Sequence, residues 1–214
     1  MSSRPKIESG IKLEVRQRDR FGCVHCGSPI FHYEHYEDYA TVGEHTAENI
    51  YLLCPDMHSR KEKAITRSEI QEWRDNPWHQ RNDGTKPEPL GFRGSSYSLQ
   101  MGEAVLTNTV GTSATALTID GHTLLGFTAV DNRLLLDLRL QLDSGTEILT
   151  VEEGELTMRT KEAWDITWVG NELSVRCAPR QYLLRVRYEL ESGFVNVLSG
   201  RFHFAGRTVI VDSG

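Results

Sequence analysis

The stretch Cys23-Val24-His25-Cys26, with Ile50-Tyr51-Leu52-Leu53 and Cys54-Pro55-Asp56-Met57-His58, decides the fold of the first third of this chain. The two cysteines of the first segment have metal-ligand spacing in a knuckle-like turn. The apolar run predicts a strand or one buried turn. Pro55 is suited to the first turn of a helix, which would carry His58 and Lys61.

Other local patterns extend this unit on both sides. Ser9 is the expected N-cap of a helix that runs to about Arg20, and a strand is expected from Ile30 to Tyr36. A loop is predicted over 37–48. A second helix is predicted from Arg67 to Trp73, with Thr66 or Ser68 as its cap.

The chain has 214 residues, which suits one large domain or two small ones. Prolines and glycines gather between residues 76 and 96 and indicate a domain boundary. Beyond it, short alternating segments are separated by turn signals such as Asp120-Gly121 and Ser144-Gly145. We therefore predict an α+β protein with an N-terminal domain over 1–85, a linker over 86–96, and an all-β domain over 97–214. The all-β domain is either a sandwich or a short β-solenoid.

Composition narrows the environment and the partners of this chain. The first ten residues lack the apolar core of a secretion signal, and no apolar run reaches the length of a membrane helix, so a cytoplasmic protein is expected. Four cysteines in a reducing compartment are not expected to form structural disulfides. Cys177 stands apart from the other three and is expected to be a small buried apolar residue.

The net charge of −6 does not favour nucleic-acid binding, but the distribution of charge matters more than the sum. Basic residues crowd the start of the chain and follow His58. We interpret Arg60, Lys61 and Lys63 as a local basic groove that contacts phosphates.

The first domain carries the residue types needed to hydrolyse a phosphodiester. Such a reaction needs an activated water, a cation near the phosphate, and stabilisation of the leaving oxygen. His35 is a candidate general base, and His58 can supply an imidazole to a metal ion. Asn49 can hold the His35 ring or the substrate. Glu34 precedes His35 on a strand, so their side chains point to opposite faces unless the strand bends.

The order of these elements resembles the HNH endonucleases, whose ββα-metal core is a hairpin followed by a helix. The matching elements are Cys23 and Cys26, Glu34-His35, Asn49, Leu53-Cys54-Pro55, and His58 with Lys61. The resemblance covers about 40 to 55 residues. It implies metal-dependent cleavage of DNA, with His35 as the base, His58 and Glu34 as ligands of the catalytic cation, and Asn49 as the orienting residue. The expected cation is Mg²⁺, with Mn²⁺, Ni²⁺ or Zn²⁺ as alternatives.

One departure from the family pattern concerns a structural zinc site. Many such nucleases carry a second Cys-x-x-Cys, whereas this chain has Met57 in place of the second cysteine. A thioether is a much weaker zinc ligand than a thiolate. Three alternatives are open: His25 or His32 is the fourth ligand, a water completes a site of Cys23, Cys26 and Cys54, or the knuckle holds no metal and Met57 packs as an apolar plug.

The sequence therefore predicts a DNA endonuclease whose β domain serves assembly, oligomerisation or targeting through a protein partner or a second copy of the chain. The family resemblance suggests a setting in restriction or phage defence. Two rivals remain: a non-catalytic nucleic-acid-binding or scaffold protein with a degenerate knuckle, and a phage-type structural protein in which the β domain is the main function.

Overall fold

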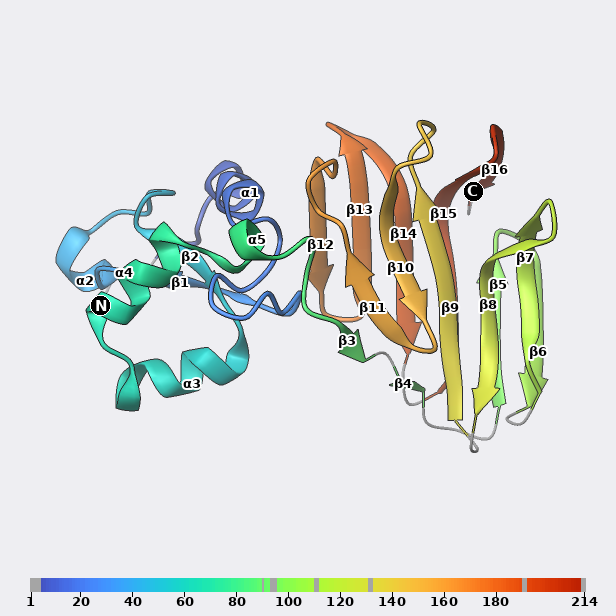
Figure 1. The fold of residues 1–214 in the computed structure, drawn as a ribbon, viewed down its shortest axis with the longest axis horizontal. Coiled ribbons are helices and arrows are strands. Elements are labelled where there is room, and N and C mark those ends of the chain that lie inside the picture. Colours follow the sequence, from blue (N-terminus) through green and yellow to red (C-terminus); the bar gives the residue numbers. More distant parts are fainter. Residues whose placement is uncertain are drawn as a thin grey trace. The chain divides into compact units, whose positions relative to one another are not determined.

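A computed structural model describes residues 5–89, 91–92, 96–109, 112–130, 133–189 and 192–212 (Figure 1). The chain divides into two compact units, residues 1–86 and 87–214. The division falls at the start of the predicted linker. Two short strands inside that linker, β3 (Glu88–Pro89) and β4 (Gly91–Phe92), pair with strands of the second unit. Helices occur only in the first unit of the described chain, so the mixed content agrees with the predicted α+β class.

The first unit is a two-stranded hairpin surrounded by helices. Its elements are α1 (Ser9–Arg18), β1 (His32–His35), α2 (Tyr39–Val42), β2 (Ile50–Leu53), α3 (Pro55–Ala64), α4 (Arg67–Asp75) and α5 (Trp78–Arg81). Strands β1 and β2 are antiparallel, with His32 opposite Leu53 and His35 opposite Ile50. The hairpin followed by α3 gives the order strand, strand, helix. The predicted loop over 37–48 contains the short helix α2.

Local sequence signals explain where these helices begin and end. Helix α1 includes Ser9, and its N-cap is Glu8 rather than the predicted Ser9. It stops before Arg20 and Phe21, because both have positive φ angles that a helix cannot accommodate. Helix α4 begins after Thr66, whose side chain and that of Glu69 form a capping box.

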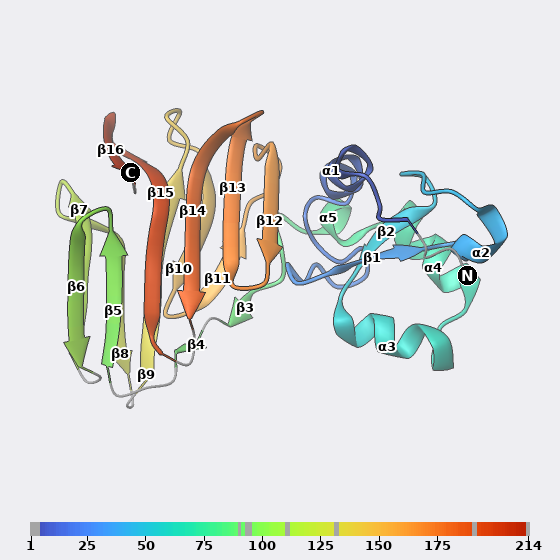
Figure 2. The same cartoon turned by 180° about the vertical axis from the view of Figure 1, so that it is seen from behind.

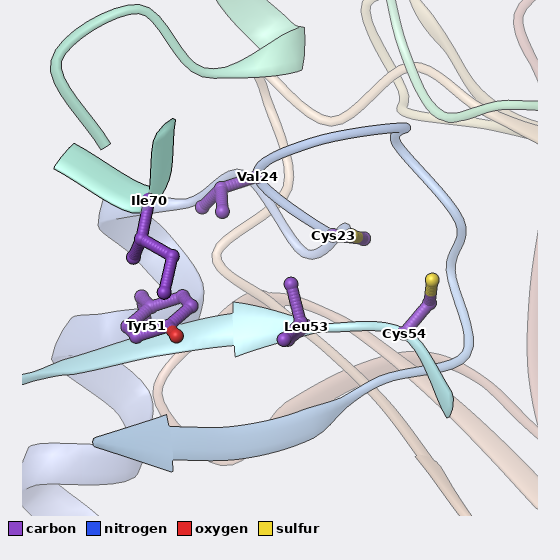
Figure 3. Packing of buried hydrophobic residues seen from close by; sticks show 6 residues of the cluster. All are labelled: Cys23, Val24, Tyr51, Leu53, Cys54 and Ile70. Carbon is purple, nitrogen blue, oxygen red and sulfur yellow. The ribbon is translucent and has the colours of Figure 1, made fainter. Parts of the chain in front are cut away.

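Two apolar clusters pack against opposite faces of the hairpin. Tyr51 and Leu53 belong to the first cluster, which also contains Cys23, Val24, Cys54 and Ile70 (Figure 3). Ile50 and Leu52 belong to the second cluster, together with Val15 of α1. The division follows from the alternation of side chains along β2. One face of the hairpin therefore meets α3 and α4, and the other meets α1.

Basic residues of α1 stabilise the fold of this unit. The Arg18 guanidinium donates to the carbonyls of Ala47 and Ile50, both at 2.6 Å. Asp19 is buried and accepts a hydrogen bond from the backbone N–H of Leu52 at 2.9 Å. Arg16 donates to the Tyr33 hydroxyl. Two of the arginines near the start of the chain, Arg16 and Arg18, therefore make hydrogen bonds within the unit.

The second unit is a sandwich of two mostly antiparallel sheets (Figures 1 and 2). One sheet has the order β3-β11-β10-β9-β8-β7, with β4 also paired to β9, and the other has the order β12-β13-β14-β15-β5-β6, with β16 also paired to β15. The remaining strands are β5 (Ser96–Met101), β6 (Ala104–Thr109), β7 (Ala114–Ile119), β8 (His122–Val130), β9 (Arg133–Gln141), β10 (Glu147–Glu152), β11 (Glu155–Met158), β12 (Asp165–Val169), β13 (Glu172–Ala178), β14 (Gln181–Glu189), β15 (Phe194–Phe204) and β16 (Arg207–Asp212).

Aromatic residues join the two sheets. The buried rings of Tyr97 on β5 and Phe127 on β8 lie 4.3 Å apart in the core, and the exposed His122 ring on β8 lies 4.6 Å from the half-buried Phe204 ring on β15. Face-to-face packing of two sheets selects the sandwich over the β-solenoid. Cys177, expected to be buried, is instead only half-buried on β13.

No helix in the described part of the chain is long and apolar enough to cross a membrane.

Substitution of Gly193 tests how tightly β15 meets β5. Gly193 has a φ of +65°, and a Cβ atom there would lie 2.6 Å from the backbone oxygen of Ser96. Gly170 has a similar φ of +60° but has nothing within 4 Å of such an atom. We expect Gly170→Ala to cost about 1–2 kcal/mol of unfolding free energy from φ alone. Gly193→Ala should cost more, measured by urea denaturation of both variants. Equal costs would contradict the close approach.

Candidate metal sites of the first unit

Three cysteines form a cluster that could hold a metal ion such as zinc. The Sγ atoms of Cys23, Cys26 and Cys54 lie within 4.8 Å of one another, and those of Cys26 and Cys54 are 3.7 Å apart. Two thiolates on a tetrahedral zinc, each at about 2.3 Å from it, would have sulfurs about 3.8 Å apart. The donor set and its spacing therefore fit a structural zinc ion.

The backbone holds these cysteines in place. Cys23 and Cys26 lie in the turn after α1, where Gly27 donates to the carbonyl of Cys23 at 2.8 Å. Val24 donates to the carbonyl of Leu52 at 3.0 Å, which ties the turn to β2. Cys54 follows β2 and is the N-cap of α3. Figure 3 shows Cys23 and Cys54 at one end of the apolar cluster.

Hydrogen bonding within the cluster separates the acidities of the three thiols. The bond with Cys23 lowers the pKa of Cys54 to about 5, helped by backbone N–H groups at the start of α3. The pKa of Cys26 is also lowered, mainly by its bond with Cys23. Hydrogen bonds to Cys26 and Cys54, followed by burial, raise the pKa of Cys23. Thiolates at Cys26 and Cys54 are the forms that bind a metal.

The proposed fourth ligands do not join this group. Met57 packs against the apolar cluster. The His25 ring lies on Trp73, with centroids 4.2 Å apart. The His32 ring lies near His58, with centroids 5.8 Å apart. Within the described residues, the metal-ligand group contains the three cysteines alone.

Zinc content tests the cysteine cluster. We expect about one zinc ion per purified chain, and its loss in Cys54→Ser, because two thiolates cannot hold zinc as three do. Chelation should lower the melting temperature strongly, since structural zinc contributes on the order of 10 kcal/mol. Elemental analysis and thermal unfolding measure both effects.

The matched control for this experiment is Cys177→Ser in the sandwich, which should keep full zinc content. A wild-type chain purified without zinc, and unaffected by chelators or added zinc, would show that the cluster does not bind zinc.

A second cluster forms where β1 faces α3. Glu34 Oε2 lies 2.9 Å from His58 Nε2, and Glu34 Oε1 lies 2.8 Å from Lys61 Nζ. Lys61 also donates to the backbone oxygen of His35 at 2.9 Å. The Glu34 side chain is 18% exposed and that of His58 is 49% exposed, so solvent reaches the pair. The prediction that Glu34 and His58 lie together agrees with this geometry.

The spacing of the Glu34 and His58 donor atoms is compatible with a shared cation. Two ligands about 2.1 Å from one ion at a right angle have donor atoms about 3 Å apart. The Glu34–His58 separation of 2.9 Å matches this value. The imidazole suits Zn²⁺ or Ni²⁺ better than Mg²⁺ or Mn²⁺, which prefer oxygen.

His35 lies on the other face of the hairpin from Glu34 and His58. Its side chain is only 4% exposed, and its Nε2 lies 2.9 Å from His45 Nδ1. His45 Nε2 in turn lies 2.9 Å from the backbone oxygen of Pro5. His35, expected as the base, and His58, expected as a cation ligand, therefore do not face a common site. The physical reason is that strand alternation continues to the end of β1.

Asn49 acts on the backbone rather than on the His35 ring. Its Oδ1 accepts from the N–H of Glu37 at 2.8 Å, and its Nδ2 donates to the carbonyl of Glu37 at 2.9 Å. The side chain thus fixes the chain two residues after His35. Any influence of Asn49 on His35 passes through this backbone contact.

The predicted phosphate-binding residues are mostly engaged within the protein. Lys61 is bound to Glu34, and Arg60 is 3.3 Å from Asp56 one helical turn earlier. Arg60 is 61% exposed and remains accessible. The side chain of Lys63 lies outside the described residues.

His45 is the residue that sequence reasoning missed as a partner of His35. It lies in the segment between β1 and β2, where no spacing rule connects it to His35. Only the fold brings the two rings together.

Comparisons with family models, with curated proteins and with solved structures found no match to this chain.

Proposed function

We propose that the first unit is a cytoplasmic DNA endonuclease that hydrolyses phosphodiester bonds with a divalent cation. The observation that carries the proposal is the close pair of Glu34 and His58, 2.9 Å apart and open to solvent. The two groups pair directly in this structure, and a carboxylate and an imidazole at this spacing can also serve as two ligands of one cation. The ordered sequence elements that resemble HNH endonucleases add support, and the same elements suggest restriction or phage defence as the setting.

The residues of this cluster have separate roles in the proposal. Glu34 and His58 hold the cation, which supplies charge stabilisation and an acidified water when bound. Lys61 holds the Glu34 carboxylate in place through its 2.8 Å contact, and Arg60 offers an exposed guanidinium to a phosphate. His35, the expected base, lies on the other face of the hairpin with its ring on His45, so the proposal gives it no direct contact with the cation pair.

The charge of the first unit does not oppose DNA binding strongly. It contains thirteen lysines and arginines and fourteen aspartates and glutamates, whereas the second unit contains eleven and sixteen. Most of the net negative charge therefore belongs to the sandwich.

Cleavage of plasmid DNA tests the cation-binding pair. We expect Glu34→Gln and His58→Ala to lower the rate of plasmid cleavage, because each removes a ligand of the cation. The decrease should exceed the ~10–100-fold that results from losing a residue that only supports a ligand. The cation concentration needed for half-maximal cleavage should rise in both variants. Nicking assays with Mg²⁺, Mn²⁺, Ni²⁺ and Zn²⁺ measure these effects.

Glu44→Gln is the control, because it removes an exposed carboxylate without touching the cluster. Wild-type cleavage by folded Glu34→Gln would remove Glu34 from the mechanism.

A second candidate function is a non-catalytic nucleic-acid-binding module, stabilised by zinc. The observation that favours it is the burial of His35 against His45. Such a module would bind DNA as the wild-type protein without cleaving it in any of the four cations. In it, His35→Ala should lower the melting temperature, since the change removes the hydrogen bond to His45 Nδ1.

For the sandwich we propose a role in assembly, with a second copy of the chain as the partner. Residues 104–119 contain no charged side chain, in a chain with 25% charged residues. This segment supplies β6 and β7, which are the last strands of their sheets in the described structure. Edge strands usually carry charges that prevent pairing. Two copies can pair through such an edge without repulsion between like charges.

The oligomeric state tests this assembly proposal. We expect the wild-type protein to be a dimer in light scattering, and Val105→Lys to be a monomer, because a lysine on an edge strand opposes pairing. Val105 lies on β6 and is 59% exposed. Val169→Lys, on the opposite edge of the same sheet, should remain dimeric. A monomeric wild-type protein would contradict the proposal.

A further inference from the structure

A second accessible feature of the first unit is a cavity of about 340 Å³ beside the cysteine cluster. Its lining includes three ring systems and three polar side chains: His25, Trp73, Trp78, Glu72, Asn76 and Arg81. The volume is at the lower end of the range for small-molecule sites. All of these residues lie within one compact unit.

The rings of this cavity are held by the protein. Trp78 donates its backbone N–H to Val24 at 2.8 Å and its indole N–H to Gly84 at 3.2 Å. Gly27 lies against the same indole, since a Cβ atom on Gly27 would be 2.3 Å from Trp78 Cδ1. Trp73 packs against the apolar cluster. The rings therefore offer preformed faces, with the Trp78 indole N–H already satisfied.

The polar side chains of the cavity remain available for a ligand. Glu72, Asn76 and Arg81 are exposed, and none of their side chains makes a hydrogen bond or ion pair within the described residues. They provide a carboxylate acceptor, an amide with donors and an acceptor, and a guanidinium. Partly buried aromatic faces next to unpaired hydrogen-bonding groups are an arrangement suited to a flat, polar ligand.

We infer that this cavity binds one unstacked nucleobase of a single-stranded nucleotide. Aromatic faces stack on bases, a carboxylate accepts from an exocyclic amine, and arginine binds phosphate. Glu72 favours cytosine, adenine and guanine over thymine, which has no exocyclic amine. Arg81 contacts the phosphate of the same nucleotide. The inference deepens the proposed function, because it rests on nucleic acid as the substrate class. It adds a binding site for one nucleotide that is separate from Glu34 and His58.

Nucleotide titration of the full, zinc-loaded chain tests the cavity. The double variant Trp164→Phe and Trp168→Phe makes fluorescence report on Trp73 and Trp78 alone. We expect saturable quenching by dAMP, dCMP and dGMP without added divalent cation. In this background, Arg81→Ala should weaken binding on the order of tenfold, as expected for one charge-assisted hydrogen bond. Glu72→Gln should weaken dCMP binding more than TMP binding.

Two controls separate base binding in this cavity from phosphate binding and from binding elsewhere on the chain. Gln80→Ala changes an exposed residue of α5 outside the cavity lining and should bind as the parent does. Ribose 5-phosphate, which lacks a base, should not quench. Quenching by ribose 5-phosphate equal to that by dCMP, or no response to any nucleotide, would overturn the inference. Because no cleavage is required, nucleotide binding by a chain that never cuts DNA would support the cavity while contradicting the endonuclease.

Discussion

The antiparallel pairing of β1 with β2 is the constraint on which the first unit depends. It assigns every side chain of these strands to one of two faces. Glu34 and Tyr51 are cross-strand partners and share the face that meets α3, while His35 and Ile50 share the face that meets α1. The Glu34–His58 pair and the buried His35–His45 pair therefore lie on opposite faces of the hairpin. A register shift of one residue would exchange the two faces and destroy both.

Much of the first unit could be predicted because its signals are local. The capping box at Thr66, Pro55 at the start of α3 and the apolar run of β2 each act over a few residues. The location of Glu34 beside His58 followed from the family pattern. The pairing of His35 with His45 could not be predicted, since it depends on how the segment between the strands folds back beside β1. The hydrogen bonds from Arg18 to the carbonyls of Ala47 and Ile50 could not be predicted for the same reason.

In the sandwich, too, local sequence patterns predict the type of structure but not the long-range strand pairing. Short alternating segments and turn signals such as Asp120-Gly121 and Ser144-Gly145 indicate an all-β unit and lie at corners between its strands. The alternation of β15 is interrupted near Ser199 and Gly200, where its register with β14 is irregular. Its parallel pairing with β5 joins segments about 95 residues apart, and no local pattern encodes such a contact.

The cysteine turn links the parts of the first unit that the chemistry requires. Val24 donates its N–H to β2 through Leu52 and accepts through its carbonyl from Trp78. The turn is therefore hydrogen-bonded both to the hairpin that carries Glu34 and to Trp78, whose ring lines the cavity. Three thiols alone, with unequal acidities, hold the turn weakly, because a buried thiolate without a cation is costly. A metal ion bound to Cys23, Cys26 and Cys54 would remove that cost and would stabilise the turn, which is bonded to the hairpin and, through Cys26, borders the cavity.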